Sequence, residues 1–285
     1  MRSLRPAQWA KNLFVLAPLV FAERLGDPGS VGRALLAAAA FCAAASALYL
    51  VNDVRDREED RRHPVKRLRP IAAGELGVPA ALVMAGLLLA AAGGAAAVLG
   101  AGFAGLLSAY VLLNLLYSAG LKRVVIVDVM IVAVGFVLRV FAGAWAIPVE
   151  VSRWLLLCTI FVALFLAFSK RRHELVLLAD GAHNQRHVLS QYSPAFLDQM
   201  INVVTASTVV AYALYAVAPE TVGKFGTTNL IYTVPFVLYG IFRFLYLMYQ
   251  RPTARNPTEA IMRDGPFLLN LLLWGGAVMA IVYGA

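Results

Sequence analysis

The stretch from residue 37 to residue 60 reads AAAAFCAAASALYLVNDVRDREED. Its first fifteen residues carry no charge, whereas seven of the last nine do. The whole chain is 61% hydrophobic and 14% charged, with a mean hydropathy of +0.74. Such long apolar segments indicate a polytopic helical membrane protein, because helices satisfy their own backbone hydrogen bonds in lipid. We therefore expect an all-α fold.

We predict nine membrane spans, because a helix of about 20 residues crosses the bilayer. The first is short and would need Trp9 and a snorkelling Lys11 to lengthen it. Residues 79–117 are too long for one crossing, so we divide them near Gly100. No linker separates two domains, which predicts a single membrane domain over residues 1–285. The spans are Leu13–Ala22, Ala34–Val51, Pro79–Gly100, Gly102–Tyr117, Val124–Ile147, Trp154–Phe168, Met200–Ala218, Ile231–Tyr249 and Phe267–Tyr283.

The basic residues predict the orientation of these spans. Of the 25 Lys and Arg residues, nineteen fall on one side of the nine-span arrangement. By the positive-inside rule that side is cytoplasmic, which places the N-terminus inside, the C-terminus outside and the chemistry at the cytoplasmic face of the plasma membrane. The net charge of +9 is explained by these loops, so we discount nucleic acid as a partner. The opposite side has four, namely Arg24, Arg33, Arg153 and Lys224.

The acidic end of the quoted stretch is a candidate metal site. If the helix continues, Asn52, Asp56 and Asp60 lie at i, i+4 and i+8 on one stripe, with Asp53 beside them. Three carboxylates and one amide oxygen are hard ligands that suit Mg²⁺, which completes its shell with water and substrate phosphate. The alternative is an ordinary solvated helix end. The basic residues that follow favour the metal, because they form a complementary anion site.

Basic side chains gather in three predicted cytoplasmic loops. Arg binds phosphate oxygens in pairs and Lys supplies a point charge, so with a metal they describe a polyanion site. Anchoring to the membrane surface is the competing explanation for each cluster. The residues are Lys66, Arg67, Arg69, Lys122, Lys170 and Arg171.

Two ionisable residues fall inside one predicted span. Asp128 and Arg139 are eleven residues apart, and so nearly share a helix face. An ionisable residue in a span usually faces the protein interior and marks a site or pathway. A structural ion pair of Arg139 with another carboxylate is the alternative.

Nine spans with an N-D-x-x-D-x-x-x-D motif after the second resemble the UbiA superfamily of intramembrane prenyltransferases. Asn52, Asp53, Asp56 and Asp60 fill this motif, which in the family holds a diphosphate through Mg²⁺. Family members carry a second aspartate-rich motif after the sixth span. Here residues 170–174 read KRRHE instead, which suits a phosphate that is bound without metal.

That variation is similar to the branch of decaprenyl-phosphate phosphoribosyltransferases, which make precursors of cell-wall arabinan. The resemblance implies transfer of 5-phosphoribosyl from phosphoribosyl diphosphate to a polyprenyl phosphate, with release of diphosphate. The similar segments are Arg5-Pro6-x-Gln8-Trp9-x-Lys11-Asn12, Lys66-Arg67-x-Arg69-Pro70-Ile71, Gly135-Phe136-x-x-Arg139 and Lys170-Arg171-Arg172-His173-Glu174.

On this resemblance we assign roles to the candidate residues. Asn52 and Asp56 ligate Mg²⁺, with Asp53 and Asp60 as direct or water-mediated support. Tyr49 contacts the ribose or is packing alone. Donor phosphates are held by Lys66, Arg67 and Arg69. A donor or acceptor phosphate is bound by Lys11, Lys122, Arg139, Lys170 and Arg171.

Two other functions stay open. A true prenyltransferase would join a prenyl diphosphate to an aromatic or lipid acceptor, and the missing second aspartate motif speaks against it. An ion-coupled transporter would carry charges in several spans, whereas here they gather at one membrane face. A homo-oligomer is also possible.

Overall fold

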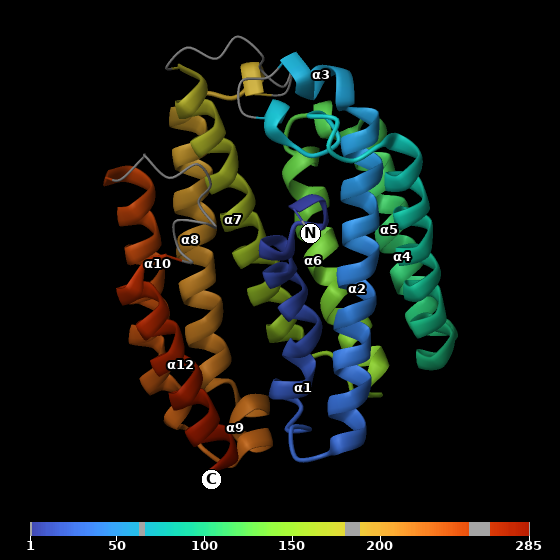
Figure 1. Ribbon diagram of the computed structural model, residues 1–285. Coiled ribbons are helices and arrows are strands. Elements are labelled where there is room, and N and C mark those ends of the chain that lie inside the picture. Colours follow the sequence, from blue (N-terminus) through green and yellow to red (C-terminus); the bar gives the residue numbers. More distant parts are fainter. Residues whose placement is uncertain (1, 63–65, 180–188, 251–262, 285) are drawn as a thin grey trace. The chain divides into compact units, whose positions relative to one another are not determined.

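A computed structural model describes residues 2–62, 66–179, 189–250 and 263–284. These residues form helices and connecting turns, and none of them forms a strand (Figure 1). The all-α prediction is therefore confirmed. The contacts divide the chain into two compact units, Met1–Val151 and Ser152–Ala285, and we describe each by itself. The single domain that the sequence suggests stays a prediction.

Eight helices in the described part of the chain are long and apolar enough to cross a membrane. Large apolar side chains point outward from them, such as Leu87 at 67% and Leu272 at 73% exposure. Lipid is the solvent that such surfaces need. Unit 1 contains α2 (Pro28–Arg55), α4 (Val78–Leu99), α5 (Ala101–Ala119) and α6 (Val127–Ala146). Unit 2 contains α7 (Arg153–Ala179), α8 (Pro194–Val217), α10 (Val234–Gln250, extended at its start by η6, Asn229–Thr233) and α12 (Gly265–Tyr283).

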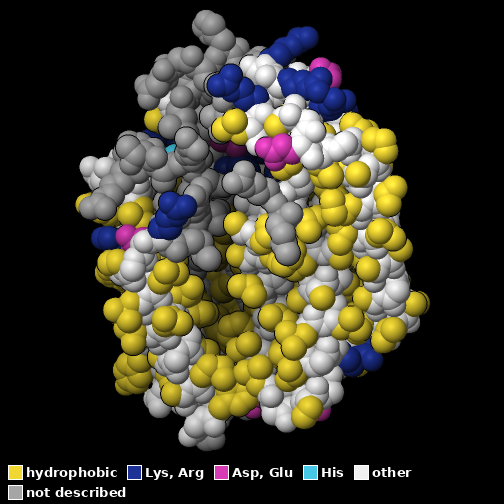
Figure 2. Space-filling model, in the orientation of Figure 1, with side chains coloured by type: hydrophobic (Ala, Val, Ile, Leu, Met, Phe, Trp, Pro, Cys, Tyr) yellow, Lys and Arg dark blue, Asp and Glu magenta, His cyan; other side chains and the backbone are white. Residues whose placement is uncertain are grey.

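The shorter elements connect these helices. Unit 1 adds η1 (Arg2–Leu4), η2 (Pro6–Leu16), α1 (Ala17–Phe21), α3 (Arg57–Arg62), η3 (Lys66–Leu68) and η4 (Leu121–Arg123). Unit 2 adds η5 (Leu189–Gln191) and α9 (Pro219–Phe225). Figure 2 shows apolar side chains along α2 and α4, and basic side chains gathered around α3.

The alanine-rich part of the quoted stretch is a helix-packing face. In α2 the buried positions include Ala37, Ala44 and Ala47, and α2 packs most extensively on α4. Ala81 and Ala85 are buried on α4 in the same cluster as Ala47. Small side chains let two helix backbones approach closely, which is how helices associate in lipid without a hydrophobic drive. The stretch therefore forms the central helix of unit 1.

The predicted division near Gly100 is confirmed. Helix α4 ends at Leu99, α5 begins at Ala101, and Gly100 between them has φ 101°. That backbone region is open to glycine and costly for other residues, so the chain reverses there without strain.

The N-terminal segment runs antiparallel to α2. Arg5 contacts Asp53 near the end of α2, Trp9 donates to Ser46, and Asn12 contacts Cys42 a turn earlier. The start of η2 therefore lies at the same end of unit 1 as the acidic motif. The chain must return to Asp27 at the other end before α2 can begin.

The geometry of η2 explains how so short a segment covers that distance. A 3₁₀ helix rises about 2.0 Å per residue and an α-helix about 1.5 Å, so the eleven residues of η2 and five of α1 extend over about 30 Å. That length matches the hydrocarbon core of a bilayer. The predicted span Leu13–Ala22 is not among the eight candidate helices, and the count of nine stays a prediction.

Unit 2 is held by polar contacts between its helices. Arg243 of α10 binds both carboxylate oxygens of Asp264, at 3.0 and 2.9 Å, and Asp264 caps α12 by accepting from the Phe267 amide. Tyr212 of α8 shares a hydrogen bond with Thr233 and accepts one from Trp274. These bonds connect three helices of unit 2, namely α8, α12 and α10 together with its η6 extension.

Candidate active site

The acidic motif contains two buried carboxylates. The exposed fractions of Asp53 and Asp60 are 3% and 2%, whereas Asn52 and Asp56 are half-buried. Asp53 and Asp60 are seven residues apart, which is about two turns, so they return to the same face. Burial of two carboxylates is costly unless each meets a positive charge or a hydrogen-bond donor.

The continuous helix expected through the motif is corrected by the structure. Helix α2 ends at Arg55 and α3 begins at Arg57, with Asp56 between them at φ −89° and ψ 7°. The amide of Asp56 still donates to the carbonyl of Asn52, and that of Asp60 to the carbonyl of Asp56. One residue leaves helical geometry, and the chain then resumes it with Asp60 turned inward.

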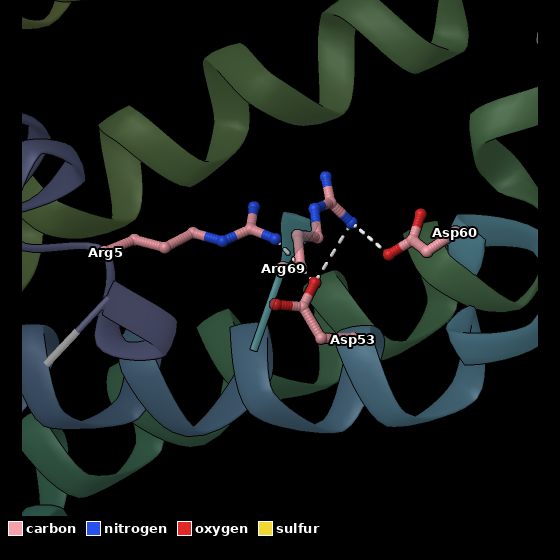
Figure 3. A network of polar contacts seen from close by, with 4 residues as sticks. All are labelled: Arg5, Asp53, Asp60 and Arg69. Atoms are coloured by element: carbon pink, nitrogen blue, oxygen red, sulfur yellow. Dashed lines mark hydrogen bonds and ion pairs between the residues drawn. The ribbon is translucent and has the colours of Figure 1, made fainter. Parts of the chain in front are cut away.

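Two arginines neutralise the buried pair (Figure 3). The Nη1 atom of Arg69 lies 3.1 Å from Oδ1 of Asp53 and 2.5 Å from Oδ2 of Asp60. The Nη2 atom of Arg5 lies 2.5 Å from the same Oδ1 of Asp53. Both arginine side chains are about 30% exposed, so they cover the carboxylates from the open side.

The loop after α3 holds Arg69 in place. Ile71 is 1% exposed and packs in a cluster with Leu50 and Ala85. Arg61 of α3 donates to the carbonyl of Ala72, which closes the loop back onto the acidic helix. Buried Ile71, the bond from Arg61 and backbone hydrogen bonds within the loop therefore fix the part of the loop that follows Arg69.

Arg139 occupies a buried polar junction in unit 1. It is 6% exposed, and it donates to Asn12 Oδ1, to the carbonyl of Gly135 and to the hydroxyl of Tyr110. Its guanidinium also lies 4.6 Å from the Tyr110 ring centroid. The predicted interior position of Arg139 is confirmed. Its bonds tie η2 to α6 and α5, and its assignment to a substrate phosphate stays a prediction.

The other candidates of unit 1 are distributed over five elements, namely α2, η2, η3, η4 and α6. Tyr49 lies under Arg5, whose guanidinium carbon is 4.9 Å from the ring centroid. Lys11 of η2 and Lys122 of η4 are half-buried, and Asp128 at the start of α6 is fully buried. In η3, the residue Lys66 is half-buried and Arg67 is exposed.

The basic pair of unit 2 shares one carboxylate. Lys170 Nζ lies 3.8 Å from Glu174 Oε1, and Arg171 Nη1 lies 2.8 Å from Glu174 Oε2. Lys170 is exposed, whereas Arg171 is buried at 4%. Their role toward phosphate stays a prediction. The sequence predicts a loop here, but α7 extends to Ala179, so Lys170 and Arg171 lie within a helix. Asp180, the next residue of the chain, lies outside the described residues.

Arg172, the next residue, belongs to a second polar group, for which the sequence analysis assigns no role. Its Nε donates to Asp198 at 2.5 Å, and Tyr249 donates its hydroxyl to the same carboxylate oxygen. The guanidinium lies 4.0 Å from the Tyr249 ring centroid. These contacts join α7, α8 and α10 at one end of unit 2.

The donor chemistry of the acidic motif fits a divalent metal. Among the described residues no three His, Cys, Asp or Glu side chains form a metal-binding group, and two rather than three carboxylates come together. Asp53 and Asp60 meet at one nitrogen of Arg69, so they already bracket a single cationic group. Mg²⁺ typically takes one or two carboxylates and completes its shell with water and phosphate.

Sequence reasoning assigned no role to Arg5, which pairs with Asp53, or to Asn12, which accepts a hydrogen bond from Arg139. Both stand in the N-terminal segment whose pattern was noted, but nothing in a linear sequence brings residue 5 to residue 53. One signal was available in the sequence. Buried carboxylates need cationic partners, and such partners had to come from basic residues elsewhere in the chain.

The fold and the site together define an integral, multi-pass membrane protein with a cluster of buried carboxylates and arginines at one end of unit 1. The model of the UbiA prenyltransferase family matches residues 13–272, and the chain belongs to that family. The resemblance inferred from the acidic motif is therefore confirmed.

Curated relatives specify the branch. A decaprenyl-phosphate phosphoribosyltransferase of Corynebacterium glutamicum is 40% identical over 75% of this chain and 66% of that protein. The protein of the same description from Mycolicibacterium smegmatis is 34% identical over 99% of this chain and 92% of its own length. That from Mycobacterium tuberculosis is 32% identical over 99% and 93%.

Solved structures agree on the fold. A UbiA homolog from Archaeoglobus fulgidus, bound to GPP and Mg²⁺, aligns with a TM-score of 0.72. The alignment covers 99% of this chain and 98% of that one, at 19% identity. At this identity the likeness concerns the fold.

Proposed function

We propose that this enzyme transfers a 5-phosphoribosyl group from phosphoribosyl diphosphate to decaprenyl phosphate or a similar polyprenyl phosphate, and releases diphosphate. The observation that carries the proposal is the match over nearly the whole chain to relatives of that description. The absence of an acidic pair in residues 170–174 agrees with it, because a prenyl diphosphate would need a second metal clamp. The product would enter cell-wall arabinan synthesis.

A divalent metal, Mg²⁺, is the proposed cofactor. Solved proteins of this fold hold Mg²⁺ together with a prenyl diphosphate. In this chain Asn52, Asp53, Asp56 and Asp60 would hold it. When bound, the metal supplies positive charge against the diphosphate that leaves.

The basic residues of unit 1 would bind the donor. Arg69 already lies at the buried carboxylates, and Lys66 and Arg67 precede it in the same short loop. Guanidinium groups give paired hydrogen bonds to phosphate oxygens and lysine gives a point charge. Positive groups held beside the departing diphosphate stabilise the charge that builds on it, which lowers the barrier to leaving.

The acceptor needs little activation. A phosphate monoester has a second pKa near ~6, so its oxygen is largely ionised at neutral pH. That oxygen attacks C1 of the ribose as the bond to diphosphate breaks. Lys11, Lys122 and Arg139 are assigned to phosphates of the donor or acceptor, and Tyr49 to the ribose. A membrane-embedded enzyme suits an acceptor whose polyprenyl chain stays in lipid.

The experiment that tests this function uses purified protein in detergent with Mg²⁺, decaprenyl phosphate and phosphoribosyl diphosphate labelled in the ribose. We expect label in the lipid fraction and stoichiometric release of diphosphate. A second reaction supplies a prenyl diphosphate and an aromatic acceptor. Product in the second reaction alone would assign the protein to the prenyltransferases instead.

Lys170 and Arg171 provide a test of the phosphate role in unit 2. If each meets a phosphate, the changes Lys170→Ala and Arg171→Ala should lower kcat/KM, and loss of a desolvated charge partner typically costs ~2–5 kcal/mol. Both side chains also pair with Glu174, so Glu174→Gln is the matched control for loss of these ion pairs alone. Parent-like turnover of both alanine variants in detergent would leave surface anchoring as the explanation.

A further inference from the structure

The buried acid pair is electrically balanced by the chain itself. Asp53 and Asp60 carry two negative charges, and Arg5 and Arg69 carry two positive charges at contact distance. Figure 3 shows the two guanidinium groups approaching from different segments, η1–η2 and the loop after η3. A divalent cation placed on these carboxylates would therefore face two cations already there.

Both arginine side chains are partly exposed, whereas the carboxylates that they pair with are buried. The arginine side chains are 29% and 30% exposed, and the carboxylates are 4% and 3% exposed. Long arginine side chains reorient by bond rotation alone, and a guanidinium binds phosphate oxygens as well as carboxylate. The carboxylates, in contrast, are fixed on α2 and α3.

Arg5 is held at this position by more than its ion pair. Its backbone lies in the left-handed region at φ 53°, and its guanidinium stacks on Tyr49. The segment that follows is fixed by Trp9 on Ser46 and by Arg139 on Asn12. The backbone of Arg5 therefore stays at the site while its side chain is free to change partners.

We propose that Arg5 and Arg69 are exchangeable counter-ions, which neutralise Asp53 and Asp60 in the empty site and pass to the diphosphate when it arrives with the metal. This inference rests on the proposed function, because it takes a divalent metal and a diphosphate as the ligands. It adds Arg5 to the donor-binding residues. It also predicts that metal and diphosphate bind cooperatively. Either ligand alone would leave the charge of the site unbalanced.

Exchange predicts opposite effects of one substitution on two ligands. Without the arginines, the carboxylates are unpaired and attract metal more strongly, but the diphosphate loses its cations. In Arg5→Gln and Arg69→Gln we expect Mn²⁺ alone to bind about tenfold more tightly than in the parent, within the usual range of coupling between sites. Inorganic diphosphate, with Mn²⁺ saturating, should bind about tenfold more weakly.

The measurement uses the full chain in detergent. Free Mn²⁺ is followed by electron paramagnetic resonance, and retention of labelled inorganic diphosphate by equilibrium dialysis with a protein-free control. Arg55→Gln is the matched variant, because it removes one positive charge from an exposed position of the same motif. It should stay within about twofold of the parent for both ligands, well below coupling on this scale. Arg5→Lys keeps the charge and should fall between parent and Arg5→Gln.

The outcomes separate this inference from the function on which it rests. A parent that binds neither Mn²⁺ nor diphosphate overturns the proposed function. A parent that binds both, with arginine variants that match it or weaken both ligands together, overturns the exchange alone. Variants are compared only when they elute as the parent does in gel filtration. If Arg5→Gln fails this criterion, Arg5→Lys is compared with the parent in its place.

Discussion

At the scale of single residues, the end of α2 separates two kinds of acidic side chain. Asp53 and Asp60 are buried and paired with arginine, whereas Asp56 lies half-buried at the turn between α2 and α3. A carboxylate at a turn keeps access to water and to an incoming ligand. Asp56 is therefore the residue of the motif whose substitution tests ligand binding with little effect on folding.

We expect Asp56→Asn to fold as the parent does and to lose most activity. The amide keeps the size of the side chain but removes the negative charge, and loss of one electrostatic contribution to the transition state typically costs ~10²–10³ in rate. The measurement is kcat with phosphoribosyl diphosphate and polyprenyl phosphate, with thermal melting as the folding control. Full activity in Asp56→Asn would remove this residue from the metal site.

A second residue-scale prediction concerns the start of α2. Asp27 caps the helix, and hydrogen bonds from Ser30 and Gly29 lower the pKa of its carboxyl from the ordinary value. A lowered folded pKa means that this cap contributes stability above the unfolded pKa, near ~3.9, and loses it as pH falls through the folded value. We expect Asp27→Ala to lower the melting temperature at pH 7.

The control for this prediction is Asp27→Asn, because an asparagine also caps helices but does not titrate in this range. The difference in melting temperature between parent and Asp27→Ala should shrink below pH 4. A constant difference from pH 7 to pH 3 would contradict an ionised cap.

At the scale of elements, the packing of η2 on α6 decides where Arg5 lies. A Cβ atom at Gly143 would come 1.9 Å from the carbonyl oxygen of Val15, so one backbone must move. We expect Gly143→Ala to lose about 1–3 kcal/mol of stability through overpacking, and to lose activity as η2 shifts. Gly94→Ala on α4 is the matched control, because its Cβ meets open space.

Thermal melting and turnover in detergent check this prediction together. Gly94→Ala should melt at or above the parent temperature, because alanine is the better helix former. A Gly143→Ala variant as stable and active as the parent would show that η2 does not depend on this contact.

A contact between helix ends explains the position of Arg33, one of the four basic residues on the side predicted to lie outside the cell. Arg33 donates from Nε to the carbonyl of Ala146 and from Nη2 to that of Leu99, at the ends of α6 and α4. Carbonyls at helix ends lack partners within the helix, and a cation there also complements the helix dipole. The positive-inside count treats this arginine as a loop charge, whereas the structure uses it as a cap.

At the scale of the whole molecule, the number of crossings can be decided by labelling. In a variant without Cys42 and Cys158, we expect external thiol reagents to label Lys224→Cys but not Arg67→Cys or Lys170→Cys, all exposed positions. Intact cells provide the assay, and permeabilised cells the control for reactivity. Labelling of Arg67→Cys from outside would reverse the orientation.

The N-terminal segment is tested in the same cells at Ala7, which is exposed. Because Arg5 binds Asp53, we expect Ala7→Cys to behave like Arg67→Cys and stay unlabelled from outside. That result would give nine crossings. External labelling of Ala7→Cys would leave eight and place η2 on the other face.

The sequence by itself determined the membrane class, eight of the helices and the position of the acidic motif. Each of these depends on local properties, namely the length of an apolar run, a glycine such as Gly100 between two helices, and charge at the end of a span. The cost of an ionisable side chain within a span also placed Arg139 in the interior correctly. These local properties were sufficient to predict the helices, because a chain segment in lipid must satisfy its own backbone hydrogen bonds and a helix is one of the few structures that does so.

Only the tertiary structure decided which charges meet. Residues 5, 53, 60 and 69 come together through the antiparallel course of η2, the turn at Asp56 and the burial of Ile71. A linear pattern suggested the stripe of Asn52, Asp56 and Asp60, but the two carboxylates that the fold buries together are Asp53 and Asp60. Pairing of buried charges depends on distances across the fold, which spacing along the chain does not contain.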